Sequence, residues 1–467
     1  MKWNDHPALR ALHQSLTRYM AEHADVADWQ IRAQYSEGCQ SLLLGTAGNA
    51  LSVYQDRSVD DLALSLTLYC PSPDGTLLGS SSGSIDPRAN LNEQLALIHS
   101  SALLAMNPFY PLADKPTGAY PKVESADARL VNHLGQTHAD LIARIAAHSL
   151  TLQAVQINSA ELFSNVHHQL LQSSNGIDAR KVSTDLYFEV AMERAPGPND
   201  QEVLKYWHFV GLDDADLEAK LDAVAIETLM TVAAELPPSR DQATILIDSY
   251  GISKLVAALV NQLDAASEFA KGPHLLPGDS VLTGTPQAGT DQLSVSVDPS
   301  LAQMAKSSPF TAEGLIAQKA EVIVNNQVLT QLIDARMAHY LGKAVNGISG
   351  NLVVNSGSLS KAELLSSAKE VIEILDFSSL LVNAATLTWS SEIKLGRLYR
   401  QGQFVATLKG GIVSGNVRAS LGGFKFSAQR VKRNTVGGYF EAASGYDGPE
   451  HMLIWTGIQI AGQAENS

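Results

Sequence analysis

The sequence predicts an α+β fold with two domains. The first is an N-terminal α/β region in which helices pack on a mixed sheet, and the second is a C-terminal, mostly antiparallel β domain that is barrel-like. Three observations lead to this prediction. The chain has 467 residues, 45% apolar and 17% charged, so it can bury more than one core. Helical and strand patterns alternate in the first half, whereas short strands and glycines dominate the second. A Pro237-Pro238 pair separates the two halves.

The first half begins with a helix and continues with strands. Leu9, Leu12 and Leu16 recur at helical spacing within the first 28 residues, and a strand pattern starts at about residue 30. The segments that follow predict, in chain order, a turn-rich loop, two helices and a group of strands, at 72–87, 90–106, 125–148 and 149–210.

One long helix ends the predicted N-terminal domain. Asp213, Asp214 and Asp216 stand where negative charge favours the start of a helix. The apolar residues that follow share helical spacing and predict its buried face: Leu217, Leu221, Val224, Leu229, Val232 and Leu236. Proline removes a backbone donor and restricts the residue before it, so Pro237-Pro238 ends the helix. We therefore place the boundary at 237–241, which predicts domains at 1–236 and 241–467.

The second half is predicted to be mainly β. It opens with a short strand, an apolar helix and a loop rich in Gly and Pro, at 243–247, 252–263 and 272–291. Asn325-Asn326 and Gln401-Gly402 each predict the turn of a hairpin, because asparagine and glycine tolerate positive φ.

A capping box predicts one further helix in the second half. Ser360 and Glu363 are spaced so that each side chain can bond to the backbone N–H of the other. The apolar residues after them predict the buried face of this helix: Leu364, Leu365, Ala368, Val371, Ile372 and Leu375.

Charge and cysteine content narrow the class of protein. The chain carries 33 basic and 48 acidic residues and a net charge of −15, which disfavours direct binding to nucleic acid or anionic lipid. Cys39 and Cys70 are its only cysteines, so no disulfide framework is expected and a reducing compartment fits best. We see neither a signal peptide nor an apolar run long enough to span a membrane. These features predict a cytoplasmic protein.

The histidines do not form a recognisable zinc motif. No His-Glu dipeptide occurs in the chain, and Leu134 stands where a glutamate would be needed between His133 and His138. Five residues of helix place these two histidines about 140° apart. His167 and His168 are neighbours in a predicted strand, so their side chains face opposite ways. We therefore expect surface or half-buried histidines and no metal.

Other catalytic patterns are weak. Gly79–Gly83 matches G-x-S-x-G, but a nucleophile elbow needs a strand, a sharp turn and then a helix, and this match lies in a Ser/Gly-rich loop. The chain contains no P-loop and no dinucleotide-binding glycine motif, so we expect no cofactor.

One segment carries an excess of positive charge. Residues 390–433 contain nine basic side chains against Glu392 alone, a charge of +8, whereas the rest of the chain sums to −23. This segment is either a set of solvated strand faces or a docking surface for an acidic partner, peptide or sister subunit. Under the second interpretation, Arg397, Arg400 and Lys409 would contribute to a dimer interface.

Five segments of the second half, in this order, resemble the TldD/PmbA family of metallopeptidase-related proteins, also named modulators of DNA gyrase. They are residues 307–342, 350–364, 389–405, 408–416 and 454–462. Within them, Phe310–Gly314 is similar to the family's F-D-x-E-G step, and Asn351–Gly357 to its segment with an asparagine followed by a strand and glycine. In the first half, the turn at 173–178 resembles the S-x-G element of the family's N-terminal domain.

The resemblance also locates the position of the family's zinc motif. Catalytic, TldD-like members carry HExxxH on a helix soon after the boundary between domains, where this chain has Val256, Ala257 and Asn261. Valine and alanine have no donor atom, and asparagine is a poor zinc ligand. No cysteine follows position 70 to supply a late ligand. The chain thus resembles the PmbA (TldE) branch, which lacks the motif, although Ala385–Ser391 replaces the family's T-G-D-F-S.

The function that this resemblance implies is a non-catalytic subunit supporting proteolysis by a TldD-like partner. Such a subunit would hold an extended peptide, which a sheet edge can bind through backbone hydrogen bonds. We expect a homodimer or a heterodimer with the TldD-like subunit, with no direct nucleic acid and no membrane among its partners. Two alternatives stay open: a self-sufficient peptidase with unfamiliar ligands, and an interaction protein that modulates a topoisomerase-type partner.

Overall fold

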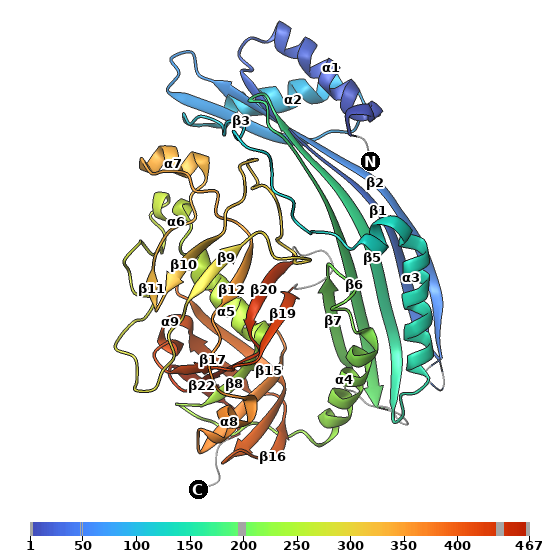
Figure 1. Cartoon of the computed structure of the whole chain (residues 1–467), viewed down its shortest axis with the longest axis vertical. Helices are drawn as coiled ribbons and strands as arrows, with labels where there is room; N and C mark the ends of the chain where they lie inside the picture. The colour runs from blue at the N-terminus through green and yellow to red at the C-terminus, as the bar shows by residue number, and fades with distance from the viewer. Residues whose placement is uncertain (1–2, 47, 49, 195–201, 436–442, 464–467) are drawn as a thin grey trace.

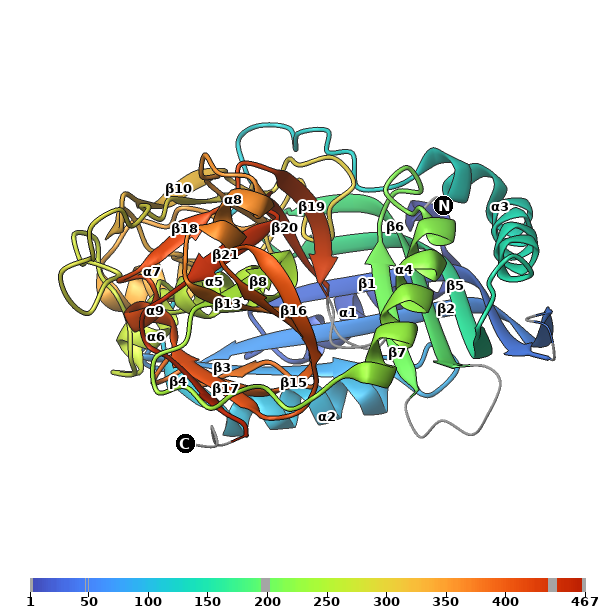
Figure 2. The same ribbon diagram turned by 90° about the horizontal axis from the view of Figure 1, so that it is seen from below.

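The computed structural model describes residues 3–46, 48, 50–194, 202–435 and 443–463. Long strands of the first half run along one side of the molecule, and the second half packs beside them (Figure 1). In the view from below, the second half lies on the left and the long strands lead to a helix at the right (Figure 2). Among the described residues, no helix combines the length and apolar character needed to cross a membrane.

The larger sheet joins strands from both halves of the chain. Its strands from the first half are β1 (Asp28–Gly45), β2 (Leu51–Pro71), β3 (Leu77–Ser84), β4 (Met106–Pro108), β5 (Val155–Ser173), β6 (Asp178–Arg194) and β7 (Val203–Phe209). Those from the second half are β9 (Val295–Asp298), β10 (Ala320–Val324), β11 (Gln327–Val328), β12 (Asn351–Val354), β19 (Arg430–Thr435) and β20 (Ser444–Pro449). The spatial order of the 13 strands is β11-β10-β9-β12-β20-β19-β7-β6-β5-β1-β2-β3-β4.

Helices of the first half cover one face of this sheet. They are α1 (Pro7–Glu22), α2 (Leu91–Leu104), α3 (Ala128–Ser149) and α4 (Leu217–Met230), with 3-10 turns at Trp3–Asp5 and Thr231–Ala233. Along β1, Ile31 and Ala33 pack in the core under α1 and α2, and Leu43 packs in the core under α3 and α4. Because side chains alternate along a strand, the residues between them face the other way. That opposite face carries polar side chains such as Ser36 and His167, which are bonded at 2.8 Å.

The second sheet belongs to the second half alone. Its strands are β8 (Ile245–Asp248), β13 (Glu370–Phe377), β14 (Leu381–Val382), β15 (Thr388–Arg400), β16 (Gln403–Leu408), β17 (Ile412–Asn416), β18 (Phe424–Phe426), β21 (His451–Ile454) and β22 (Ile458–Ala461). The order is β18-β21-β8-β13-β15-β17-β22, with β14 and β16 also paired to β15. The remaining helices are α5 (Ser249–Asn261), α6 (Ala265–Phe269), α7 (Ala335–Leu341), α8 (Lys361–Ser366) and α9 (Val417–Ser420).

Helix α5 lies in the core between the two sheets. Its residues Ile252 and Leu259 are fully buried. They belong to one apolar cluster with Ile247 of β8 in the second sheet and with Val297 of β9 in the larger one. The position of α5 is therefore determined by strands of both sheets.

The α+β fold class is confirmed. In each sheet one pair of described strands is parallel, β12–β20 in the larger and β8–β13 in the second, and the other ladders between named strands are antiparallel. The mixed character of the larger sheet thus comes from the second half of the chain. The two halves meet within this sheet where Asn434 of β19 pairs with His208 of β7. The division into domains at 1–236 and 241–467 stays a prediction.

Three sequence predictions of secondary structure are wrong for tertiary reasons. The loop expected at 72–87 contains β3, whose small residues let α2 approach closely. A Cβ on Gly79 would lie 2.2 Å from the carbonyl oxygen of Ala102, and one on Gly83 would lie 2.8 Å from Ile98. Segment 79–83 is therefore strand, and a nucleophile elbow has no place there.

The helix expected after Ser360 is shorter than predicted. The capping box forms, but α8 ends at Ser366, and Val371 and Ile372 lie in β13. The parallel pairing of Ile372 with Ile245 of β8 replaces the local helical pattern. Tertiary pairing here outweighs helical spacing.

The helix expected to end at Pro237 stops at Met230. The chain leaves it, and Glu235 then pairs with Leu408 of β16. Leu229 within α4, and Val232 and Leu236 beyond it, are 40%, 47% and 51% exposed instead of buried.

Both predicted hairpins are confirmed. Asn325 and Asn326 have φ of 50° and 67° between β10 and β11. Gln401 and Gly402 have φ of 49° and 77° between β15 and β16. Positive φ at both turn positions is the geometry that closes two-residue hairpins.

The first testable prediction concerns His138 in α3. Its Nε2 bonds to Ser41 at 2.8 Å and its Nδ1 to Ser164 at 2.9 Å, and burial lowers its pKa below the ordinary 6.5. The unfolded chain therefore takes up this proton at a higher pH than the folded chain does. The contribution of neutral His138 to the free energy of unfolding is complete above about pH 6.5. As the pH falls, this contribution decreases by up to about 1.4 kcal/mol per pH unit.

Urea unfolding between pH 7.5 and 5.5 measures this effect. The midpoint should fall more steeply in the natural protein than in His138→Gln, which cannot titrate. Equal slopes in the two proteins would show that His138 does not contribute.

Candidate functional site

Helix α5 forms one wall of three cavities. Asp248 caps its first turn, and its Oδ1 accepts hydrogen bonds from the N–H groups of Tyr250 at 3.0 Å and Gly251 at 3.2 Å. Two cavities lie at the start of the helix and the third near its end. The α5 residues that line them include the half-buried Lys254 and Ala257 and the exposed Asn261.

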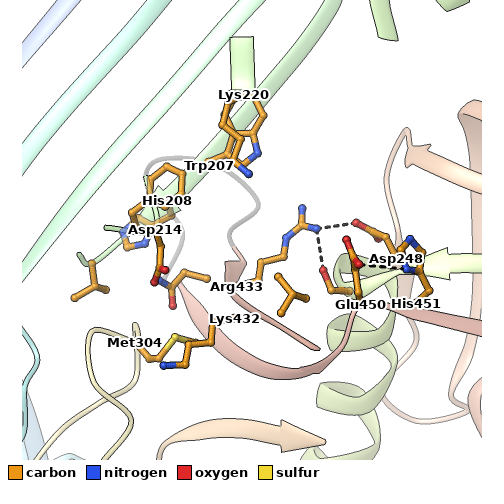
Figure 3. Close-up of a pocket in the computed structure, with 15 residues that line it drawn as sticks. Trp207, His208, Asp214, Lys220, Asp248, Met304, Lys432, Arg433, Glu450 and His451 are labelled. Carbon is orange, nitrogen blue, oxygen red and sulfur yellow. Dashed lines mark hydrogen bonds and ion pairs between the residues drawn. The ribbon is translucent and has the colours of Figure 1, made fainter. Parts of the chain in front are cut away.

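The first cavity lies between the two halves at the N-terminal end of α5 and has a volume of about 240 Å³. Figure 3 shows Trp207, His208 and Lys220 on one side of it, Asp248 and His451 on the other, and Arg433 between them. The side chain of Arg433 donates from Nη1 to Asp248 Oδ2 at 2.7 Å and to Ser249 Oγ at 3.3 Å. This ion pair joins β19 to the start of α5, and both elements belong to the second half.

Electrostatics in this first cavity are set by burial and by neighbouring charges. Burial lowers the pKa of His451, and the positive charge of Lys361 adds to that effect. Burial likewise lowers the pKa of Lys220, helped by Arg433, and the ammonium of Lys220 lies 6.0 Å from the ring of Trp207. A positively charged lysine over an aromatic face is stabilised by the ring quadrupole.

The second cavity adjoins the first and has a volume of about 530 Å³. Lys205 of β7 crosses the junction here, with its Nζ 2.9 Å from Glu227 of α4 and 3.0 Å from Asp376 of β13. Burial alone would lower the pKa of Lys205, but the two carboxylates outweigh it and raise that pKa. Tyr250 adds an aromatic wall, and burial raises its pKa to about 12.

The third cavity lies beside the C-terminal half of α5 and has a volume of about 380 Å³. Its carboxylates accept hydrogen bonds from the N–H groups that start short helices: Asp264 from Ala266, Glu313 from Ala335, and Asp334 from Met337. Burial raises the pKa of Glu313. The acidic groups of this cavity are therefore engaged in building its walls.

Asn351 holds the far wall of the third cavity. The residue is fully buried; its Nδ2 donates to Asp298 O at 3.1 Å and to Ser307 Oγ at 2.9 Å, while its Oδ1 accepts from Lys306 N at 2.8 Å. A Cβ on Gly445 would lie 2.0 Å from this Oδ1, so glycine is required there. The sequence identified the Asn351–Gly357 segment, and the structure explains its asparagine.

Two of the three positions that the resemblance aligns with the family's zinc motif lie in the same cavity. Ala257 and Asn261 line the third cavity, whereas Val256 is 5% exposed and packs in the core. Ala257 has no donor atom, and Asn261 offers only an amide. Within the described part of the chain, no group of three histidine, cysteine or carboxylate side chains with metal-binding spacing lies in this cavity. The residues present do not fit a catalytic zinc ion.

Two segments that resemble the family in sequence meet in space. Phe310 packs against Tyr120, and the hydroxyl of Tyr120 donates to Gly314 O at 2.6 Å. A Cβ on Gly314 would lie 2.6 Å from Ile177, which belongs to the 173–178 turn. The F-x-x-E-G step therefore docks on the end of the long β5–β6 hairpin and places Glu313 in the third cavity.

The remaining histidine and cysteine candidates have structural surroundings. His133 lies at a kink of α3 and His138 is buried, so the expectation of a surface or half-buried histidine is wrong for His138. His167 Nε2 lies 2.6 Å from Asp185 Oδ1, whereas His168 lies on the opposite face beside Tyr35. Burial raises the pKa of both thiols, Cys39 and Cys70. Neither thiol is activated as a nucleophile.

The +8 segment is not a free positive patch. Five of its nine basic side chains form ion pairs with carboxylates from elsewhere in the chain: Lys394, Arg397, Arg400, Arg430 and Arg433. A sixth, Arg418, donates to backbone carbonyls of Ser280, Val281 and Leu282. These contacts favour the interpretation that the charge lies on strand faces and stabilises the fold of the second half, and the docking interpretation stays a prediction.

Several charged residues around the first two cavities were not identified from the sequence. Lys205, Asp248 and Glu227 were not singled out, and Arg433 was noticed only as one charge among nine. Asp248 carried a usable signal, because an aspartate that directly precedes an apolar helix is a typical N-cap. Its partner could not be identified, since 185 residues separate Asp248 from Arg433.

Comparison with known families gives a match to the C-terminal part of the chain. Residues 242–450 match the family model described as the PmbA/TldA metallopeptidase C-terminal domain. This range contains α5 and the residues around the third cavity. No curated protein matches the chain in sequence.

Solved structures share the fold over nearly the whole chain. A protein of Bacteroides thetaiotaomicron, described as a proposed modulator of DNA gyrase, is 16% identical with a TM-score of 0.74, covering 98% of this chain and 100% of its own. TldE from Thermococcus kodakarensis is 12% identical with a TM-score of 0.76, covering 96% and 100%. A protein of Thermotoga maritima, also described as a proposed gyrase modulator, is 14% identical with a TM-score of 0.69, covering 96% and 100%. At sequence identities this low, the comparison shows a shared fold.

The second testable prediction concerns the cap of α5. Asp248→Ala removes both the cap and the partner of Arg433, and should lower the free energy of unfolding by about 2 kcal/mol, of which the cap accounts for about 1. Asp216→Ala is the matched control, because Asp216 caps α4 through one hydrogen bond to Ala219 N, and it should cost about 1 kcal/mol. Urea unfolding measures both. Equal costs would mean that the pair with Arg433 adds no stability.

Proposed function

The chain belongs to the PmbA/TldD family through its C-terminal domain, and from this premise we propose that it is a PmbA (TldE)-type subunit without a catalytic metal. In this role it holds an extended peptide while a TldD-type partner, which carries the zinc motif, cleaves the peptide. The likeness in fold to TldE from Thermococcus kodakarensis supports this assignment to a branch. The cytoplasm is the compartment we propose for it.

One observation carries the proposal. The third cavity has a volume of about 380 Å³ and a hydrogen-bonded wall around Asn351, yet α5 presents Ala257 and Asn261 to it where donor atoms for zinc would be needed. A hydrolytic zinc site requires three protein ligands and a bound water. A cavity retained without those ligands favours binding over hydrolysis.

The cavities beside α5 suit a peptide better than a compact ligand. They follow one another along the same helix, from Tyr250 past Lys254 to Asn261. Their walls combine aromatic rings with amide and charged groups, which can contact both the backbone and the side chains of an extended chain.

The assembly we propose is a dimer formed mainly by residues after about 240, heteromeric with the TldD-type partner or homomeric when the chain is expressed alone. Strand β16 supports this, because it pairs with β15 and carries Phe404 and Val405 at 57% and 45% exposure. Open strand edges with apolar side chains are usually covered by a partner.

The third testable prediction concerns activity. The purified chain alone should not hydrolyse unstructured casein peptides above background, and a HExxxH-containing homologue from the same genome should co-purify with it and hydrolyse them. Activity of the chain alone that is lost with a chelator and returns with zinc would instead identify a self-sufficient peptidase.

The fourth prediction tests peptide holding in the assembled pair. Ala257→Arg fills the third cavity and should raise KM for the peptide at least about tenfold, because a blocked site weakens substrate binding more than chemistry. Ala362→Arg, on the exposed side of α8, is the control and should leave KM unchanged. Pull-down of the partner should be equal for both variants. An unchanged KM in Ala257→Arg would contradict a peptide-holding role for this cavity.

The fifth prediction concerns association. Sedimentation at tens of micromolar should report a dimer, and Phe404→Glu should shift it toward monomer if β16 lies at the interface. Arg397→Glu should instead act mainly on stability, since Arg397 faces Glu373 within the chain. A monomer of the natural protein at this concentration would reject the dimer.

A further inference from the structure

We propose that His23, Asp25 and His99 form a zinc-binding site that fastens α1 to α2. The candidate ligand atoms of these three side chains lie within 4.8 Å of one another. Within the described residues, this is the only group of three histidine, cysteine or carboxylate side chains with such spacing. Two imidazoles and one carboxylate, completed by water, are a ligand set that Zn²⁺ accepts.

The geometry requires only small side-chain movements. In a tetrahedral zinc site with bonds of about 2.05 Å, neighbouring ligand atoms lie about 3.3 Å apart. His99 Nε2 and Asp25 Oδ2 are 2.9 Å apart, and the rings of His23 and His99 have centroids 5.2 Å apart at an interplanar angle of 72°. Opening the first pair slightly and drawing in the imidazole of His23 would create the coordination sphere.

The hydrogen bond on the far side of His99 favours metal binding through Nε2. Its Nδ1 lies 3.1 Å from the hydroxyl of Tyr19, which can accept the ring proton. A histidine that binds zinc through one nitrogen normally donates from the other to an oxygen, and this fixes its tautomer and ring orientation. Tyr19 also stacks on His23, with ring centroids 4.1 Å apart, so one side chain orients both imidazoles.

The backbone holds the three ligands without closing the site to solvent. His23 caps the end of α1 through its N–H to Tyr19 O at 3.0 Å, and the N–H of Val26 donates to His23 O at 3.1 Å. On α2, His99 is 6% exposed, whereas the side chain of Asp25 is 48% exposed. Water and metal can therefore reach the site from the side of Asp25.

Other histidine–carboxylate contacts in the chain lack these features. His148 lies 2.8 Å from Asp222 and His167 lies 2.6 Å from Asp185, and neither pair belongs to a group of three ligands within the described chain. These two pairs are simple histidine–carboxylate contacts. The proposed zinc site differs from them because it includes a second imidazole.

The site is separate from the cavities beside α5. Helices α1 and α2 lie side by side over the end of the long sheet (Figure 1), whereas α5 lies in the core between the two sheets. A zinc ion here would link α1 and the chain that follows it to α2. Its role is structural, and it does not depend on the proposed function. It also differs from the sequence prediction that the chain holds no metal.

Zinc titration of the full chain tests the inference. Protein treated with a chelator and freed of it is titrated with Zn²⁺ against a chromophoric indicator, and Co²⁺ is added separately to record its visible spectrum. The expected result is one zinc per chain with a Kd of about 1 μM or tighter, intense tetrahedral Co²⁺ bands, and a Tm that rises with zinc.

Matched variants separate this site from surface binding. Asp25→Asn keeps the shape of a half-exposed side chain and should weaken zinc binding at least about tenfold, as should His23→Asn. Asp222→Asn, at the histidine pair on α4, should bind zinc as the natural protein does. Far-UV circular dichroism and the metal-free Tm check that the variants fold. Zinc binding unchanged in Asp25→Asn, or binding by the natural protein only above about 100 μM, would overturn the proposal.

Discussion

The ion pair between Asp248 and Arg433 is the interaction on which the arrangement of the cavities depends. Oδ1 of Asp248 caps α5, and Oδ2 accepts a hydrogen bond from the guanidinium of Arg433 on β19. Strand β8 and α5 belong to the core between the sheets, whereas β19 is the strand that meets β7 of the first half. A single aspartate therefore sets the start of α5, and with it the direction of the helix face that lines all three cavities.

Two contacts fasten the halves to each other at separate places. Lys205 connects β7 to Glu227 and Asp376, and the Phe310–Gly314 step docks on the end of the β5–β6 hairpin through Tyr120 and Ile177. The first contact is electrostatic and partly buried, so removing one partner would leave charge without compensation. The second is a close packing contact that depends on a glycine. The first two cavities are lined by residues of both halves, whereas the third is lined by residues of the second half.

The third cavity has hydrogen-bonded walls but no zinc-ligand side chains at the two α5 positions, Ala257 and Asn261, that face it. Its walls are built with buried hydrogen bonds around Asn351, and its acidic residues start the neighbouring helices. The α5 positions that the resemblance aligns with the family's zinc motif, and that line this cavity, carry an alkyl group and an amide. Likeness in fold does not determine the chemistry of the cavity, because function depends on the residues in the site.

The sequence by itself determined what depends on neighbouring residues. The α+β class, the two hairpins and the capping box at Ser360 could be predicted, because periodicity and spacing along the chain indicate them. Only the tertiary structure decided that Ile372 is in a strand, that Val256 lies in the core, and that Asp248 meets Arg433 across 185 residues. The same holds for His23, Asp25 and His99. Contacts between distant segments form when whole sheets and helices pack, and no local pattern in one sequence encodes which charges or imidazoles will then be neighbours.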